Sequence, residues 1–261
     1  MSLEEFYRHF RAGMDPDDET ARERFYSIVS FLRKTGIKAT TVLDLCAGTG
    51  IAGVAAVKAF SASQLTLLDK REEDMFKVTE WLEVGNVRPS IFMVSGDVLS
   101  LPELVGTHDS ALLFGHTMAH FNPFEAIRLF SAVSLVLNEE GSFILEEVDR
   151  IKKFLFSSRY RDFIVEATGK TKVVSLHKGY EVKRGVERRA FYRLPEFEEI
   201  AELDIRLWDL ASLVAMGKIF FKASNLVTPE EHGIQGLSNI ILMKKPKKDI
   251  ALRIYSEFRN L

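Results

Sequence analysis

The feature that most constrains the fold is a glycine-rich turn between an apolar strand and a small-residue helix. Residues 41–45 (TVLDL) have the apolar, partly β-branched character of a buried strand, and residues 51–60 (IAGVAAVKAF) that of a helix. The turn between them and the first residues of the helix have the sequence Gly48-Thr49-Gly50-Ile51-Ala52-Gly53, which matches the pattern G-x-G-x-x-G. Glycine lets the backbone bend sharply, and the amino end of the following helix carries partial positive charge. These parts together predict a βαβ unit with a ligand at the turn.

The same alternation of strands and helices continues over the next hundred residues. Further strands are predicted at 64–68 (ending at Asp69), 90–94, 110–114 and 142–146, with helices at 71–84 and 123–137 and a closing turn at 138–141. Strands that alternate with helices of this length form parallel sheets. The sequence therefore predicts an α/β fold with a doubly wound, mostly parallel sheet.

The rhythm changes on either side of this region. Residues 3–35 are predicted to be helical, closed by Gly36. After residue 150, strands are predicted at 172–176, 180–182 and 188–194, with a turn at 177–179, and we expect them to lie as an antiparallel excursion over the carboxyl edge of the sheet. A helix at 209–221, a late strand at 237–243 and an amphipathic helix at 247–260 complete the chain.

Composition excludes several classes of protein. The 261-residue chain has a formal net charge of −2 and one cysteine, Cys46, which rules out an internal disulfide framework and a cysteine-based zinc site. Its basic clusters, residues 244–248 and 183–189, are interpreted as solvated turns or strand edges. No apolar run reaches the roughly 18 residues that span a bilayer, and the acidic start of the chain does not resemble a secretory signal. We therefore expect a cytoplasmic protein with no membrane contact, and we predict no particular oligomeric state.

Three acids follow or interrupt the predicted strands. Asp69 lies 19 residues after Gly50 (69 − 50), where a carboxylate can accept hydrogen bonds from both hydroxyls of a ribose. That placement suits a nicotinamide dinucleotide and S-adenosylmethionine equally. Asp44, inside the first strand, favours the second, because it would attract an ammonium and a sulfonium, whereas a pyrophosphate site would gain nothing from a carboxylate there. Asp97, 28 residues after Asp69 (97 − 69), can accept the adenine amine, with Val98 against the ring; and no arginine or lysine is expected to crowd the loop.

These stretches resemble the class I S-adenosylmethionine-dependent methyltransferases, of the small-molecule type. The resembling segments are residues 42–50 (VLDLCAGTG), 67–69 (LLD) and 96–102 (GDVLSLP), within a likeness that covers about residues 40–150. The resemblance implies a Rossmann-like sheet with strand order 3-2-1-4-5-7-6 and an antiparallel seventh strand, which residues 237–243 would form. It further implies that Gly48 and Gly50 border the methionine part, Asp69 holds the ribose, and Asp97 with Val98 holds the adenine. The full set of predicted cofactor-binding residues is Asp44, Cys46, Ala47, Gly48, Gly50, Asp69, Lys70, Asp97 and Val98.

The resemblance also organises the chain as one methyltransferase domain over residues 1–261. Residues 1–38 are N-terminal helices, 40–150 the cofactor-binding half, 151–195 the antiparallel cover, and 196–261 the remaining sheet and C-terminal helix. Purely structural interpretations stay open for the acids: Asp44 as a buried acid bonded to backbone, Asp69 as a strand-end cap and Asp97 as a turn former. Cys46 is interpreted as a packing residue with no nucleophilic role.

The segment after the fourth strand, Gly115-His116-Thr117-Met118-Ala119-His120-Phe121, should face the acceptor. We take His116 as the candidate general base or hydrogen-bond partner, with His120 a weaker candidate because Phe121 beside it looks like core. No third ligand accompanies the two histidines, so no metal site is predicted. Asn122-Pro123 is interpreted as a helix start, which argues against a base-methylating nucleic-acid enzyme.

The sequence thus predicts transfer of a methyl group from S-adenosylmethionine to a small molecule. Methylation of RNA or protein and a non-catalytic module that binds S-adenosylmethionine are the alternatives; an oxidoreductase is disfavoured by Asp44 and Asp97. Residues 150–195 are expected to cover the acceptor pocket, and aromatic side chains near the N-terminus are possible lid residues. The proposed walls are Tyr180, Phe191 and Tyr192, and the proposed lid residues are Phe6, Tyr7, Phe10, Phe25 and Tyr26.

Overall fold

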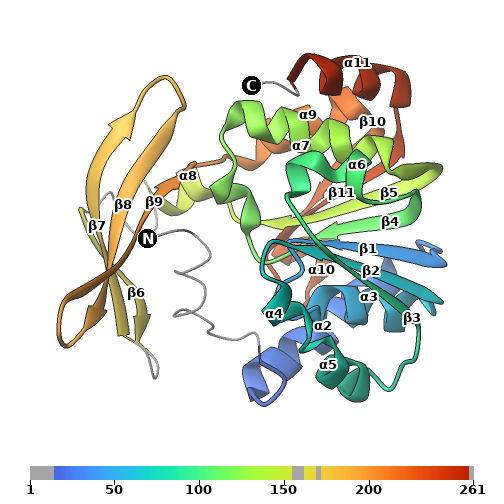
Figure 1. The fold of residues 1–261 in the computed structure, drawn as a ribbon, viewed down its shortest axis with the longest axis horizontal. Helices are drawn as coiled ribbons and strands as arrows, with labels where there is room; N and C mark the ends of the chain where they lie inside the picture. The colour runs from blue at the N-terminus through green and yellow to red at the C-terminus, as the bar shows by residue number, and fades with distance from the viewer. Residues whose placement is uncertain (1–14, 155–161, 169–171, 259–261) are drawn as a thin grey trace.

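The computed structural model describes residues 15–154, 162–168 and 172–258, and its centre is a seven-stranded sheet (Figure 1). The strands lie in the order β10-β11-β5-β4-β1-β2-β3. Their bounds are β1 Thr41–Leu45, β2 Gln64–Asp69, β3 Ser90–Ser95, β4 His108–Leu113, β5 Leu137–Glu147, β10 Phe221–Val227 and β11 Asn239–Pro246. The first five strands run parallel, and β11 is antiparallel to both of its neighbours. Read from β3, this is the predicted order 3-2-1-4-5-7-6, so the predicted fold class is confirmed.

Helices cover both faces of this sheet and enclose two apolar cores. On one face Val42 and Leu65 pack against α2 and α3; on the other, Leu43 and Leu113 pack against α7, α9 and α11. The helices are α2 Glu19–Lys34, α3 Ile51–Phe60, α4 Glu72–Met75, α5 Val78–Gly85, α6 Leu101–Leu104, α7 Pro123–Leu135, α8 Arg150–Lys152, α9 Leu210–Phe220, α10 Pro229–His232 and α11 Lys248–Phe258, with short 3₁₀ turns η1 Val98–Ser100 and η2 Thr117–His120. None of these described helices has the length and apolar character to cross a membrane.

Capping residues set several of the helix ends. Asp18 caps α2 by accepting from the Thr20 N–H at 2.8 Å, and Gly36 follows that helix with φ +66°. Asn122 begins α7 with a capping box, because its side chain accepts from the Glu125 N–H while Glu125 accepts from the Asn122 N–H. The interpretation of Asn122-Pro123 as a helix start is therefore confirmed.

The helix predicted over residues 71–84 is instead two helices, α4 and α5, separated at Phe76 and Lys77. The two pieces have different anchors. Asp74 in α4 is paired with Arg71 at the end of β2, whereas Trp81 in α5 donates its indole N–H to Thr49 Oγ1 at 3.1 Å. Likewise, residues 138–141, predicted as a turn, belong to the long strand β5.

A separate four-stranded antiparallel sheet has the order β6-β7-β8-β9. Its strands are β6 Phe163–Thr168, β7 Lys172–Glu181, β8 Val186–Leu194 and β9 Glu198–Ile205. The antiparallel excursion is confirmed, but its predicted turn at 177–179 is wrong, since β7 runs through it. Gly179 marks a register shift between β7 and β8, and the hairpin turn lies at residues 182–185, where Gly185 has φ +63°.

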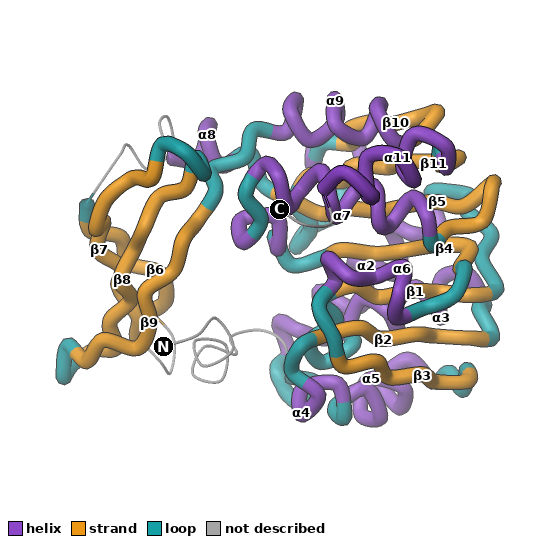
Figure 2. Tube along the Cα trace, turned by 45° about the horizontal axis from the view of Figure 1, so that its top comes forward, coloured by secondary structure: helices purple, strands orange, loops and turns teal. Residues whose placement is uncertain are grey.

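This second sheet stands beyond the carboxyl ends of the parallel strands (Figures 1 and 2). It joins the main body through η2, because the Arg206 N–H donates to the Ala119 carbonyl at 2.8 Å. The Trp208 indole N–H then donates to the carbonyls of Met118 and Phe121 at 2.9 and 3.1 Å. The segment that the sequence assigned to the acceptor is thus the seam between the two sheets.

Candidate functional site

A cavity of about 610 Å³ opens at the carboxyl ends of β1, β2 and β4, within the roughly 300–1,000 Å³ typical of small-molecule sites. Its walls include nine of the ten residues predicted for the site: Asp44, Cys46, Ala47, Gly48, Asp69, Lys70, Asp97, Val98 and His116. Gly50 is the exception. It is the N-cap of α3 with φ +83°, and a Cβ added there would lie 3.1 Å from Val78 Cγ2. Gly50 therefore sets the conformation of the turn and packs against α5 without lining the cavity.

The turn after β1 holds three residues in left-handed conformations, Cys46 at φ +52°, Gly48 at +53° and Gly50 at +83°. This run brings the backbone back on itself, so that the Ala47 N–H donates to the Leu68 carbonyl at 3.1 Å and ties the turn to β2. Cys46 lines the cavity, and burial raises the pKa of its thiol, which keeps the sulfur protonated and weakly nucleophilic. Its interpretation as a residue without a nucleophilic role remains a prediction.

Asp44 is a buried acid on the α3 side of β1, 2% exposed. Its Oδ2 accepts from the Gly53 N–H at 2.7 Å, and a Cβ on Gly53 would lie 2.8 Å from the same oxygen. Burial raises the pKa of Asp44 to about 8, and the Gly53 hydrogen bond offsets only part of that effect. Within the described residues no ion pair neutralises it.

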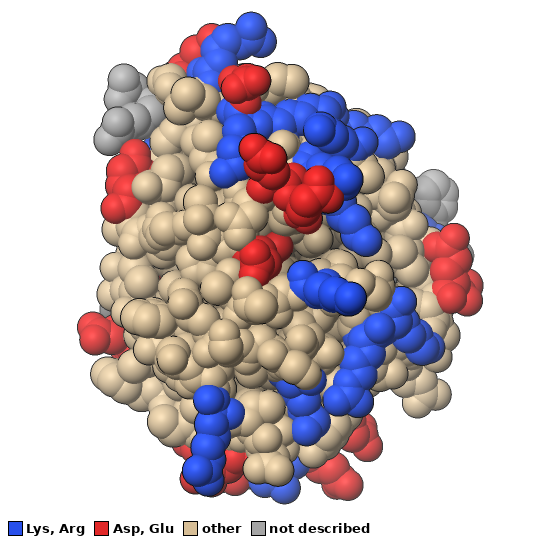
Figure 3. Space-filling model, turned by 90° about the vertical axis from the view of Figure 1, so that its right-hand side faces the viewer, with Lys and Arg blue, Asp and Glu red and all other residues tan. Residues whose placement is uncertain are grey.

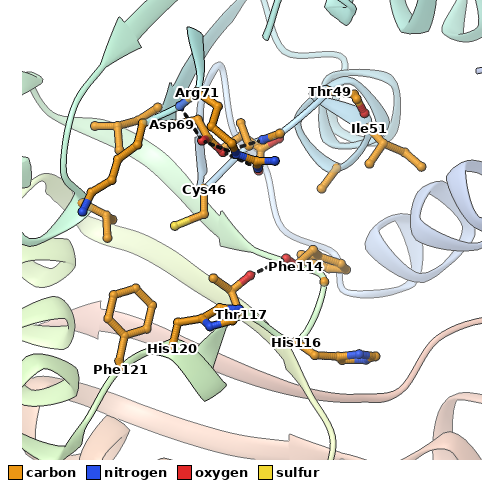
Figure 4. A pocket seen from close by; sticks show the side chains of 18 of the residues that line it. Cys46, Thr49, Ile51, Asp69, Arg71, Phe114, His116, Thr117, His120 and Phe121 are labelled. Atoms are coloured by element: carbon orange, nitrogen blue, oxygen red, sulfur yellow. Dashed lines mark hydrogen bonds and ion pairs between the residues drawn. The ribbon is translucent and has the colours of Figure 1, made fainter. Parts of the chain in front are cut away.

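Asp69, at the end of β2, is engaged on both carboxylate oxygens. Oδ2 accepts from the Gly48 N–H at 2.8 Å and Oδ1 from the Arg71 N–H at 2.9 Å. The Arg71 guanidinium adds Nε at 3.3 Å and Nη2 at 3.4 Å (Figure 4). Its Nη1 lies 2.6 Å from Asp74 Oδ2. The expectation that no arginine lies near the loop is wrong, because Arg71 Nη2 lies 3.7 Å from where a Gly48 Cβ would be.

Asp97 follows β3 and is half-exposed. Its Oδ1 accepts from the Leu99 N–H at 2.9 Å, and its Oδ2 lies 2.8 Å from Lys70 Nζ. Burial opposes ionisation of this carboxyl, but the bonds from Lys70 and Leu99 outweigh it and lower the pKa of Asp97. Val98 is buried beside it and lines the cavity.

Two histidines line the cavity from the seam after β4. His116 Nε2 lies 2.8 Å from Ser238 Oγ, and in Figure 4 its ring points away from Cys46, whereas the His120 ring lies across the cavity from Cys46. Burial lowers the pKa of each histidine to about 4, so both imidazoles are neutral near pH 7. Among the described residues no group of acids, histidines and cysteine is arranged to hold a metal ion.

Glu146, at the end of β5, fixes the surroundings of His116. It is fully buried, forms an ion pair with Arg24 of α2, and accepts from the Gly115 and Ser238 N–H groups at 3.2 and 3.1 Å. These bonds and the nearby Arg24 lower the pKa of Glu146 although its burial opposes them. One acid thereby joins the N-terminal helix to the loop after β4 and to the start of β11.

Two of the five proposed lid residues, Phe25 and Tyr26, do not line the cavity. Cavity walls on the N-terminal side come from Thr20, Arg24 and Ile28 of α2. Phe25 instead stacks on Trp81 at 5.4 Å in the core, and the half-exposed Tyr26 does not line the cavity. The other three lid residues proposed lie outside the described part of the chain.

A second, more open hollow of about 310 Å³ lies between the two sheets, lined by His120, Arg188, Glu202, Leu203 and Asp204. Arg188 Nε lies 2.9 Å from Asp204 Oδ1 and 3.5 Å from Glu202 Oε1. His120 lines both hollows.

The aromatic walls proposed for the acceptor lie elsewhere in the second sheet. Phe191 belongs to that sheet's own small core, and Tyr192 stacks on Phe197 with ring centroids 4.5 Å apart. Tyr180 is more than half exposed and lines neither hollow.

The two basic clusters are engaged in local structure. Lys245 lies 2.9 Å from Glu140, and Lys247 and Lys248 donate to backbone carbonyls. This cluster forms the end of the antiparallel strand β11 and the two residues after it, so it lies at the end of the sheet opposite the cavity. Figure 3, which views the side away from the second sheet, shows lysine and arginine gathered toward the top with acids among them. In the other cluster, Arg189 is buried against Glu187 at 2.6 Å.

No model of a known family matches this sequence, and no curated protein sequence matches it. Solved structures do resemble the fold. The PH0226 protein from Pyrococcus horikoshii OT3 is 19% identical, with 94% of this chain and 100% of that chain covered and a TM-score of 0.66. An S-adenosylmethionine-dependent methyltransferase from Clostridium acetobutylicum ATCC 824 is 13% identical, covering 85% and 91%, with a TM-score of 0.62. CalS10, an amino pentose methyltransferase from Micromonospora echinaspora solved with bound S-adenosylmethionine, is 16% identical, covering 85% and 89%, with a TM-score of 0.52.

At sequence identities this low, the structural similarity establishes a shared fold and nothing about function. The chain has the Rossmann-like fold of S-adenosylmethionine-dependent methyltransferases, complete through the antiparallel strand β11 and the added sheet beyond β5.

Proposed function

We propose that this protein transfers a methyl group from S-adenosylmethionine to a small-molecule acceptor. The observation that carries the proposal is Asp44, a buried acid that lines the cavity and has no ion-pair partner among the described residues. A carboxyl in that position is costly to ionise until a cation arrives. S-adenosylmethionine brings an ammonium and a sulfonium, whereas a dinucleotide brings a pyrophosphate that Asp44 would repel.

The remaining cavity residues fit the other parts of that molecule. Asp69 is assigned to the ribose, and Asp97 with the apolar Val98 to the adenine; the turn of Cys46, Ala47 and Gly48 is assigned to the methionine part, next to Asp44. Asp97 keeps acceptor capacity beyond its bonds to Leu99 and Lys70, since an ionised carboxylate has about four acceptor positions. Lys70 borders the adenine position through this ion pair.

When bound, the cofactor supplies an electrophilic methyl group on sulfur. The protein's part is to align the acceptor, exclude water and accept the proton that an alcohol or amine loses on methylation. His116 and His120 are both neutral near pH 7 and able to take that proton. We favour His120, because it lines both hollows.

A small acceptor is favoured by the size and lining of the second hollow. Its Arg188, Glu202 and Asp204 suit a compact polar molecule, and Arg188 and Lys245 of the two basic clusters are each already paired with an acid. CalS10, an amino pentose methyltransferase of similar fold, acts on a molecule of this size class.

Calorimetric titration and transfer assays test the proposal together. S-adenosylmethionine and S-adenosylhomocysteine should bind at micromolar concentrations and NAD should not; tighter binding of NAD would refute the cofactor assignment. Labelled methyl groups should then pass to a low-molecular-weight extract. Label that enters only RNA or protein would refute the small-molecule acceptor, and tight binding without transfer to any pool would indicate a non-catalytic module.

A further inference from the structure

The Asp69 carboxylate has no remaining capacity for a ribose. An ionised carboxylate offers about four acceptor positions, and four N–H contacts from 2.8 to 3.4 Å already approach Asp69. Two come from the backbone of Gly48 and Arg71 and are fixed by the fold. The other two come from the Arg71 guanidinium and belong to a side chain that can rotate.

Asp97 provides a contrast within the same cavity. It accepts one backbone N–H, from Leu99, and one ammonium, from Lys70, so it can take a further donor without losing either. Asp69 can bind a pair of ribose hydroxyls only if the guanidinium leaves it.

Arg71 also has a second anchor to retain it after such a move. Its Nη1 lies 2.6 Å from Asp74 Oδ2, and both side chains are largely buried. The guanidinium therefore bridges two acids, of which Asp74 is on the α4 side and Asp69 faces the cavity. Release from Asp69 would leave the arginine paired with Asp74.

We infer that Arg71 is a gating residue for the cofactor: its guanidinium occupies the positions on Asp69 that a ribose diol takes, and binding exchanges one for the other. This inference rests on the proposed function, since it takes Asp69 as the ribose acid. The exchange lowers cofactor affinity, because part of each ribose hydrogen bond replaces a bond that the empty site already makes. Arg71 in this role is a positioning residue that touches the acid and competes with the ligand.

The test compares two proteins with two ligands. Adenosine carries the diol and 2′,3′-dideoxyadenosine lacks it. In Arg71→Met, adenosine should bind about tenfold more tightly than to the wild type, while the affinity for dideoxyadenosine stays within twofold. Arg71→Lys keeps the charge but lacks the planar guanidinium, so its affinity for adenosine should lie between those of the wild type and Arg71→Met. It serves as the readout if Arg71→Met does not fold. Arg88→Met is the matched control, because it removes one exposed positive charge before β3, at the opposite end of the sheet.

Each other outcome has a distinct meaning. Equal or weaker adenosine binding by both Arg71 variants would overturn the gate and show that the guanidinium helps to hold the ligand. Equal wild-type affinity for adenosine and dideoxyadenosine, unchanged in the variants, would overturn it by removing Asp69 as the ribose acid. Failure of the wild type to bind S-adenosylhomocysteine would instead contradict the proposed function.

Discussion

Binding of S-adenosylmethionine should strengthen steeply with pH, because Asp44 must lose a proton to meet the ligand's positive charge. Its pKa of about 8 in the empty site leaves roughly 1% of the carboxyl ionised at pH 6 and roughly 24% at pH 7.5. If only the ionised form binds well, affinity should rise about 20-fold over that interval, or about 1.9 kcal/mol. The pH range ends at 7.5 because the ligand's own α-amino group titrates near pH 8.

Titration calorimetry in two buffers of different ionisation enthalpy measures both the affinity and the proton released. We expect close to one proton released per ligand at about pH 6.5. Asp44→Asn keeps the shape and the acceptor for Gly53 but cannot ionise, so its affinity should be nearly independent of pH and match the wild type at low pH. A flat wild-type profile, or the same slope in Asp44→Asn, would refute Asp44 as the partner of the ligand's cation.

Three further predictions concern other parts of the molecule. His120→Ala should lower kcat at least about tenfold with S-adenosylhomocysteine affinity unchanged, and the wild-type rate should show no histidine titration between pH 6 and pH 8; a larger loss in His116→Ala would reverse the assignment. Gly53→Ala should cost about 1–3 kcal/mol of unfolding free energy in urea, because its Cβ would lie 2.8 Å from both Asp44 Oδ2 and Leu65 Cδ1, whereas Gly106→Ala, with nothing within 4 Å, should change it by less than about 0.5 kcal/mol. Glu202→Gln should raise the acceptor KM several-fold and leave cofactor affinity intact if the second hollow holds the acceptor; an unchanged KM would exclude that role.

The main sheet was predictable because its signals are local. Each parallel strand is a short apolar run beside a turn or cap, and the order follows from the family likeness of the segments that hold Asp44, Asp69 and Asp97. Strands β9 and β10 were not predicted, because their patterns of apolar residues are weaker. β10 alternates apolar residues with Lys222, Ser224 and Asn225 at the sheet edge, so it reads as loop, and β9 is rich in glutamate.

The hairpin of the second sheet shows how two glycines can mislead. Gly179 and Gly185 both interrupt an apolar pattern, and the sequence alone does not say which one makes the turn. The structure answers through strand pairing: Tyr180 pairs with Glu187 and Glu181 with Val186, so the two strands stay paired beyond Gly179, where there is only a register shift. Such a choice depends on which register pairs more side chains, a property of both strands together.

Arg71 was missed for a different physical reason. Sequence spacing locates the backbone at a strand end, but an arginine side chain reaches several residues in any direction, and its place depends on which acids the fold brings within range. Asp69 and Asp74 lie five residues apart (74 − 69) on different elements, and only the break between β2 and α4 lets one guanidinium meet both. The three acids of the cavity consequently differ in state: Asp44 has no cationic partner among the described residues, Asp97 is paired with the exposed Lys70, and the acceptor positions of Asp69 are all used. Because the ligand contacts all three acids, proton release from Asp44 and displacement of the Arg71 guanidinium from Asp69 should both contribute to its net affinity. The effects of the Asp44 and Arg71 variants on that affinity should therefore be additive, unless the released guanidinium moves toward Asp44.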